Sequence, residues 1–287
     1  MKEKALKQRS PKLQDFAIGV NDLPTIPDLA AQLLRKTADP QARAEDVRRI
    51  ISQDPALAAR VLKLANSSFY ARSKEIKTLT HAIVIVGFNS VKSMVMASVT
   101  RGLHRSFGAT GRLLWRHSWG AAVAAKVIGQ HVGYDELEEA FLAGLLHDIG
   151  KVVLLAKAPS TMERIVEVAK DHTGGDFCIL EKRCFGFDHT RVGHLVVRNW
   201  RFSQDFEEAI GMHHDPGKAK VVPELVHLTR LASMFCHKLG MGIVHRPELD
   251  LATDLSSVFF QLSKEDVEAL AEEIQDVAQS NVKDVFR

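Results

Sequence analysis

Four short segments between residues 117 and 214 carry residues that could bind a metal ion. The candidate ligands are His117, His147, Asp148, His189, His213 and His214. Histidine nitrogens together with one carboxylate suit divalent first-row transition ions better than Ca²⁺ or Mg²⁺. We expect iron or manganese first, with zinc, nickel and cobalt as further candidates, in a mononuclear or dinuclear site. Such ions could catalyse phosphoester hydrolysis by polarising the phosphoryl oxygen.

The pair His147-Asp148 is the most informative of these segments. It follows the nearly unbroken apolar run 140–146, which must be buried in a folded chain. Burying a carboxylate without a partner is costly, so a cation, a metal or a hydrogen-bond network must lie beside Asp148. Adjacent residues of a helix point about 100° apart, and two ions that share Asp148 would satisfy that geometry.

The other candidates each have a structural alternative. His117 lies beside Trp115 and Trp119 and could be a packed core histidine, and His189 could be one as well. His213-His214 ends a helix that Ser203 can begin and that Asp215-Pro216 stops, which places the pair at the edge of a cavity. Lys151 either holds a phosphate or is a helix-surface cation near Asp148. The remaining histidines are predicted to be structural or exposed: His81, His104, His131, His172, His194, His227, His237 and His245.

Apolar residues throughout the chain recur at spacings of three and four, which predicts helix after helix with short connections. The fold class is therefore all-α, an orthogonal helical bundle. Asp54-Pro55 resembles a helix start, and Ser263 with Asp266 resembles a capping box ahead of the last helix. The glycine-containing stretch 102–111 interrupts the pattern and is the best candidate boundary.

Composition excludes several classes of function. With 38 Lys and Arg against 35 Asp and Glu, the net charge is only +3, so nucleic acid is not an expected partner. The basic residues between positions 2 and 12 could contact an anionic partner, although a solvated terminus is the simpler interpretation. Three cysteines without Cys-x-x-Cys spacing indicate free thiols in a reducing compartment. No stretch predicts a membrane span or a signal peptide, so we expect a cytoplasmic protein.

The N-terminal half contains four motifs in a characteristic order. They are Leu23-Pro24-Thr25-Ile26-Pro27, Asp54-Pro55, Asn66-Ser67-Ser68-Phe69-Tyr70 and Ala82-Ile83 leading to Gly87. In this order they resemble the HDOD family, and the resemblance covers about residues 20 to 240. It implies an HD-domain-like helical bundle with an additional N-terminal helical subdomain, found in bacterial signalling proteins.

The candidate ligands also fit this resemblance. Their order is similar to the ligand series of the HD phosphohydrolase superfamily, closest to its HD-GYP branch. The supporting motifs are Ala143-Gly144-Leu145-Leu146-His147-Asp148-Ile149-Gly150-Lys151, His189-Thr190-Arg191-Val192-Gly193 and His213-His214-Asp215-Pro216. Two features depart from the pattern. Ser233 falls near the position where HD enzymes carry their last Asp ligand, and the Gly-Tyr-Pro motif is missing.

The resemblance divides the chain into four parts. These are a basic segment (1–20), the N-terminal helical part of HDOD (21–105), an HD-like part with the metal site (106–245) and a helical extension (246–287). Two functions stay open. The chain is either a regulatory signal-transduction module that acts through signalling proteins or a small ligand, or a metal-dependent phosphohydrolase for a nucleotide, a cyclic nucleotide or another phosphoester. Only in the second case would Asp148 and Lys151 be catalytic.

Overall fold

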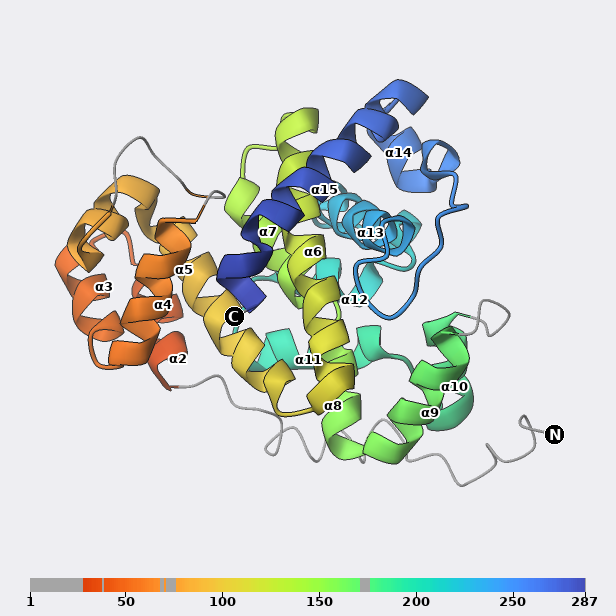
Figure 1. The fold of residues 1–287 in the computed structure, drawn as a ribbon, viewed down its shortest axis with the longest axis horizontal. Coiled ribbons are helices and arrows are strands. Elements are labelled where there is room, and N and C mark those ends of the chain that lie inside the picture. Colours follow the sequence, from red (N-terminus) through yellow and green to blue (C-terminus); the bar gives the residue numbers. More distant parts are fainter. Residues whose placement is uncertain (1–27, 38, 68–69, 71–75, 171–175, 287) are drawn as a thin grey trace. The chain divides into compact units, whose positions relative to one another are not determined.

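The structure, a computed structural model, describes residues 28–286 apart from 38, 68–69, 71–75 and 171–175. The predicted basic segment 1–20, the Leu23–Pro27 motif, part of the Asn66–Tyr70 motif and His172 lie outside the described residues. The described residues form helices and no strand, so the all-α fold class is confirmed (Figure 1).

The helices are α2 (Asp28–Thr37), α3 (Ala44–Ile51), α4 (Pro55–Ala65), α5 (Leu79–Arg105), α6 (Gly108–Val132), α7 (Leu137–Leu146), α8 (Ile149–Lys157), α9 (Pro159–Lys170), α10 (Phe177–Phe185), α11 (His189–Asn199), α12 (Gln204–Met212), α13 (Pro223–Lys238), α14 (Leu255–Phe259) and α15 (Lys264–Phe286). Two 3-10 turns, η3 (Pro216–Lys218) and η4 (Leu251–Thr253), accompany them. The described chain forms two compact units. One contains 28–102 and 272–286, and the other contains 103–271.

Local side-chain chemistry explains several helix ends. The Asp54 carboxylate accepts hydrogen bonds from the backbone N–H groups of Ala56 and Leu57 at 2.8 and 3.0 Å, which caps α4 as predicted. Ser263 and Asp266 form the predicted capping box at the start of α15, with reciprocal bonds of 2.9 and 3.0 Å.

Asn66 has a specific role in the smaller unit. Its side chain donates to the carbonyl of Ile76 at 2.7 Å and accepts from the backbone N–H of Ile76 at 2.8 Å. This paired contact fastens the end of α4 to the chain just before α5. The same unit contains Gly87, whose φ of 84° interrupts α5 and divides it into two helical pieces.

Helix α5 is long and apolar enough, by length and composition alone, to cross a membrane. However, 56% of its most apolar window is buried inside the protein. A core helix of a soluble protein passes the same test, so this feature is weak evidence for a membrane span.

Helix α6 is the central element of the larger unit, and it packs against α7, α8 and α13 (Figure 1). The approach of α7 is very close. A Cβ atom on Gly144 would lie 2.4 Å from the carbonyl oxygen of Ala121, so no larger residue fits there. Helices α8 and α11 also pack together, and a Cβ atom on Gly150 would lie 2.0 Å from the carbonyl oxygen of His189. Gly144 therefore lets α6 approach closely just before the His147-Asp148 pair, and Gly150 lets α11 approach α8 just after it.

Candidate metal centre

His147 and Asp148 lie at the junction of two helices. Helix α7 ends at Leu146, His147 is its C-cap residue, and Asp148 is the N-cap residue of α8. The expectation that the pair lies inside one helix was therefore wrong. The break between α7 and α8 lets both side chains point into the same cluster, where an unbroken helix would separate their directions by about 100°.

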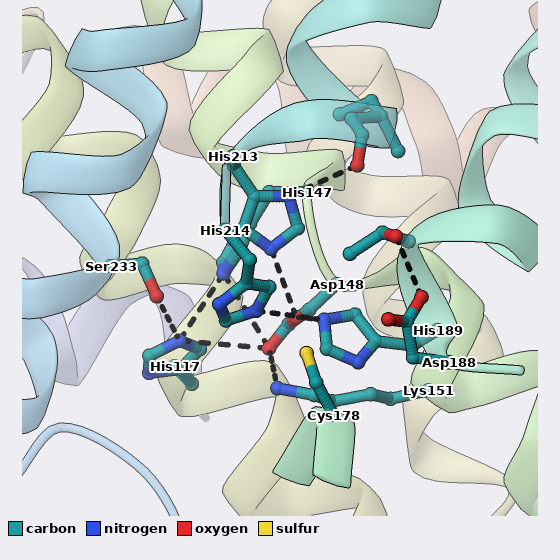
Figure 2. Close-up of polar contacts among 12 residues, drawn as sticks. His117, His147, Asp148, Lys151, Cys178, Asp188, His189, His213, His214 and Ser233 are labelled. Carbon is teal, nitrogen blue, oxygen red and sulfur yellow. Dashed lines mark hydrogen bonds and ion pairs between the residues drawn. The ribbon is translucent and has the colours of Figure 1, made fainter. Parts of the chain in front are cut away.

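The structure brings all six predicted ligands together. Figure 2 shows His117, His147, His189, His213 and His214 arranged around the carboxylate of Asp148. They come from α6, the α7–α8 junction, the first residue of α11 and the end of α12. His147 and His189 are fully buried, and Asp148 is 2% exposed. The site is built from segments nearly a hundred residues apart. His117, His147, Asp148, His189 and His213 are buried, and His214 lies on its solvent-exposed side.

The two oxygens of Asp148 face different histidines. Asp148 Oδ2 lies 3.6 Å from His117 Nε2 and 3.5 Å from His147 Nε2. Asp148 Oδ1 lies 3.2 Å from His189 Nε2 and 4.0 Å from His213 Nε2. The ligands therefore fall into two groups that share one carboxylate. We call the group with His117 and His147 the first position and the group with His189, His213 and His214 the second position.

The Nδ1 atoms of four of these histidines face away from Asp148. Those of His117, His147 and His213 donate to the backbone carbonyls of Met241, Gly144 and Ile210 at 3.1, 2.7 and 3.0 Å. His189 Nδ1 donates to the Glu181 carboxylate at 2.6 Å. A proton fixed on Nδ1 leaves the lone pair of the neutral ring on Nε2, directed into the cluster. Metal-binding histidines in proteins are oriented by the same kind of contact.

The protonation states also suit metal binding. Burial lowers the pKa of His117 to about 3 and that of His147 to about 4, and it lowers the pKa of His213 and His214 well below the usual value. Neutral imidazole is the form that binds a metal. Burial would raise the pKa of Asp148, but the neighbouring His147, Lys151 and His189 hold that pKa well below its usual value. His117, His147, His213 and His214 therefore offer neutral nitrogens around an ionised carboxylate.

The distances between ligand atoms match those around one metal ion. His117 Nε2 lies 3.2 Å from His147 Nε2, and His189 Nε2 lies 3.2 Å from His214 Nε2. Nitrogens bound to one ion at 2.0 to 2.1 Å are separated by about 2.9 to 3.4 Å in octahedral or tetrahedral geometry. His213 Nε2 and Asp148 Oδ1 are buried and have no hydrogen-bond partner within the described chain. A cation beside them would satisfy both atoms.

Glu181 is a buried residue of the site that the sequence did not reveal. Its carboxylate accepts the backbone N–H of His189 at 2.8 Å as well as the ring Nδ1–H. Burial alone would lower the pKa of His189, but Glu181 and Asp148 outweigh that effect and raise the pKa to about 9. Glu181 therefore fixes the position and the ring orientation of His189, and a metal must displace a proton from that ring.

Replacing Glu181 with glutamine should weaken metal binding at the second position by about 10- to 100-fold, because the amide removes the negative charge that the two N–H groups of His189 face. Calorimetric titration with Zn²⁺ measures the effect. Glu208→Gln is the matched control. The Glu208 carboxylate also accepts backbone N–H groups, those of Lys220, Val221 and Val222, but it lies outside the cluster. Equal affinities in the two variants would contradict the role given to Glu181.

Ser233 occupies α13 at the edge of the first position. Its hydroxyl oxygen lies 3.2 Å from His117 Nε2. A hydroxyl brings no negative charge. Among the described residues, the potential metal ligands grouped at the first position are His117, His147 and Asp148.

A cavity of about 170 Å³ adjoins the cluster. Its lining includes Lys151, Asp176, Phe177, His213, His214, Arg230, Ser233, Met234, His237, Val244, Arg246 and Leu249. Lys151 connects the two regions: its ammonium group lies 2.7 Å from Asp148 Oδ2 and 4.6 Å from the centre of the Phe177 ring. Arg230 is held by Asp254 at 2.8 Å. Three cationic side chains and one carboxylate give the cavity a net positive lining.

Two further residues near the cluster were missed from the sequence. His237, predicted to be structural or exposed, lines the cavity and stacks on the His117 ring at 4.8 Å. It follows Ser233 by four residues on α13, and that spacing places both on one helical face. Cys178 lies close to His189 and His214. No local motif marks Cys178, because its proximity depends on how α10 packs.

Comparisons with known proteins place this fold among solved structures. An HDOD domain protein with unknown function from Geobacter sulfurreducens is 26% identical, with a TM-score of 0.81 over 94% of this chain and 96% of that one. A "Putative signal transduction protein" from Marinobacter aquaeolei VT8 is 20% identical, with a TM-score of 0.74 over 99% of this chain and 65% of that one. A "Putative metal-dependent phosphohydrolase" from Shewanella amazonensis SB2B is 22% identical, with a TM-score of 0.67 over 97% and 98%.

Among curated proteins, an uncharacterized protein of Treponema pallidum (strain Nichols) is 22% identical over 217 residues, or 75% of this chain. The chain spans 42% of the length of that relative. The model of the HDOD domain matches residues 23–216, which include the Asp54-Pro55 motif and all six predicted ligands. This chain belongs to the HDOD domain family.

Proposed function

We propose that the chain is a regulatory module of bacterial signal transduction with a dinuclear transition-metal centre. The first position would bind one ion through His117 and His147, the second would bind another through the remaining histidines, and Asp148 would bridge them. The observation that carries this proposal is the arrangement of the Nε2 atoms. They converge on one carboxylate while the Nδ1 atoms of His117, His147, His189 and His213 are fixed by hydrogen bonds.

The donor set favours iron or manganese, with zinc, nickel and cobalt as alternatives. The cavity beside the centre would bind a small phosphate-bearing ligand, because Lys151, Arg230 and Arg246 line it. Binding of that ligand would be transmitted to signalling proteins. The resemblance to a protein described as a signal transduction protein supports a regulatory role, and the missing acidic ligand at Ser233 favours it over hydrolysis.

Arg246 gives the most direct test of the ligand. Unlike Arg230, it has no ion pair within the described chain, so its guanidinium group is available to an anion. The Arg246→Gln variant should bind inorganic phosphate about tenfold more weakly in the metal-loaded protein, which corresponds to about 1.4 kcal/mol. Isothermal calorimetry measures the affinity. Lys264→Gln is the control, because Lys264 is an exposed cation on α15 outside the cavity lining.

Absence of phosphate binding to the metal-loaded protein, or equal affinity in both variants, would contradict the ligand class. Measured metal content must be the same in both variants, because Arg246 is not among the clustered ligands. A loss of metal in Arg246→Gln would therefore show that the change acts on the fold rather than on the cavity.

Hydrolysis of a nucleotide, a cyclic nucleotide or another phosphoester is the second candidate. The buried Lys151 favours it, because this side chain contacts Asp148 and also lines the cavity, where it could hold a phosphoryl group. Bound metal ions would supply Lewis-acid polarisation of that group. Release of phosphate from adenosine monophosphate or its cyclic form by the metal-loaded protein, abolished in Lys151→Gln, would replace the regulatory proposal. No release above the metal-free protein would support the regulatory role.

A further inference from the structure

Cys178 is a buried thiol beside the second position. It lies in the first turn of α10, where its backbone N–H donates to the Asp176 carboxylate at 2.7 Å. The residue is 7% exposed. Its sulfur and one ring nitrogen each of His189 and His214 all lie within 4.8 Å of one another. Figure 2 shows the side chain pointing toward the histidines.

The spacing of the two nitrogens suits a shared metal ion, and the sulfur lies within 4.8 Å of a ring nitrogen of each histidine. A sulfur bound at about 2.3 Å and a nitrogen bound at about 2.0 to 2.1 Å are separated by about 3.6 Å in a tetrahedral site. The paired nitrogens of His189 and His214 are 3.2 Å apart, as ligands of one ion would be. The buried Asp148 Oδ1, which has no hydrogen-bond partner in the described chain, lies 3.2 Å from His189 Nε2 and points into the same space.

The other two cysteines do not share this arrangement. Cys184 is buried on the same helix, six residues further along, and Cys236 packs against the position of Gly120. Neither belongs to a group of potential ligands among the described residues. Of the three buried thiols, only that of Cys178 lies near histidines of the cluster in the described chain.

We propose that Cys178 supplies a thiolate ligand to the second metal position, beside His189, His214 and Asp148. This inference rests on the proposed dinuclear centre. It makes the two positions chemically different, because the first offers nitrogen and oxygen donors while the second adds a soft sulfur donor. Thiolate favours zinc, cobalt or iron over manganese and magnesium. The second position should therefore select a softer ion than the first.

Binding requires that the thiol lose its proton. Burial is the main cause that raises the pKa of the Cys178 thiol in the metal-free chain, and the negative charge of Asp176 adds to it. The incoming divalent ion forms a bond to sulfur as the S–H bond breaks, and the proton leaves to solvent. The oxidation state of the sulfur does not change, and no further reactant is needed.

Cobalt(II) substitution tests this ligand directly. Thiolate bound to Co²⁺ gives an intense near-ultraviolet charge-transfer band, which imidazole and carboxylate ligands do not give. We expect the band in the wild-type protein and in Cys184→Ser, and we expect it to disappear in Cys178→Ser. Cys184→Ser is the matched control, because it removes a buried thiol from the same helix outside the cluster.

Cobalt stoichiometry, measured on the same samples, separates the possible failures. Two bound Co²⁺ ions without the band in wild type would overturn the role of Cys178 and leave the proposed centre standing. No bound Co²⁺ would overturn the proposed centre itself. A band that persists in Cys178→Ser would assign the thiolate to another cysteine.

A second measurement guards against a folding defect in Cys178→Ser. Competition between Zn²⁺ and Mn²⁺ measures the ratio of the zinc affinity to the manganese affinity at the second position. This ratio should be at least about tenfold higher in wild type than in Cys178→Ala. An unchanged preference in a folded variant would overturn the proposal.

Discussion

The Asp148→Asn variant should lose both metal ions, and its metal-free form should unfold at a lower urea concentration than the metal-free wild type. Asp148 faces both positions, through Oδ2 and Oδ1, so one substitution affects both. It also leaves the buried ammonium group of Lys151 without its partner at 2.7 Å. Removing one member of a buried ion pair costs about 3 to 5 kcal/mol. Elemental analysis and urea titration measure the two effects.

Asp215→Asn is the control for this experiment. Asp215 follows His214 directly but is exposed and pairs with Lys218 on the surface. Such surface pairs contribute about 0 to 1 kcal/mol, so this variant should retain its metal and its stability. Retention of two metal ions by Asp148→Asn would contradict the bridging role, and unchanged stability would contradict the burial of the Lys151–Asp148 pair.

Gly150→Ala should be the most destabilising single-methyl change near the site. The added Cβ would meet the carbonyl oxygen of His189 at 2.0 Å and the backbone nitrogen of Gly193 at 2.9 Å. Both contacts are backbone atoms, which cannot rotate away, so α8 and α11 must separate. We expect a loss of about 3 kcal/mol in the free energy of unfolding. Zinc affinity at the second position should fall with it, because the displaced residue is the proposed ligand His189.

Gly217→Ala provides the comparison, because a Cβ atom there would have nothing within 4 Å. Thermal and urea unfolding should place this variant within about 0.5 kcal/mol of wild type. If Gly150→Ala were equally stable, the close packing of α8 on α11 would be wrong. The account of how the fold positions His189 would then fail with it.

The sequence predicted those features whose cause is local. Caps at Asp54 and at Ser263 with Asp266 depend on side chains a few residues from the backbone groups that they bind, so short motifs were sufficient. The burial of His147 followed from the apolar run before it. The break between α7 and α8 was not predicted, because the apolar pattern continues through Ile149 and gives no sign that a helix ends.

Residues that join the cluster through tertiary packing were beyond the sequence pattern. Glu181 reaches His189 across the turn that follows α10, and His237 reaches His117 from a distant helix. Neither lies in a recognisable motif. Their types gave no signal either, since a buried glutamate and a half-buried histidine are recognised as part of a site only when their partners are known. The paired arrangement of ligands around Asp148 likewise required coordinates.

Elemental analysis of the wild-type protein measures whether two transition-metal ions share Asp148. The protein is purified without a chelating tag and without chelator, and the result is expressed as metal atoms per chain. We expect about two ions of iron, manganese or zinc, which dialysis against a strong chelator removes. About one ion per chain would contradict the bridging role of Asp148, and the absence of stoichiometric metal would contradict the metal centre itself.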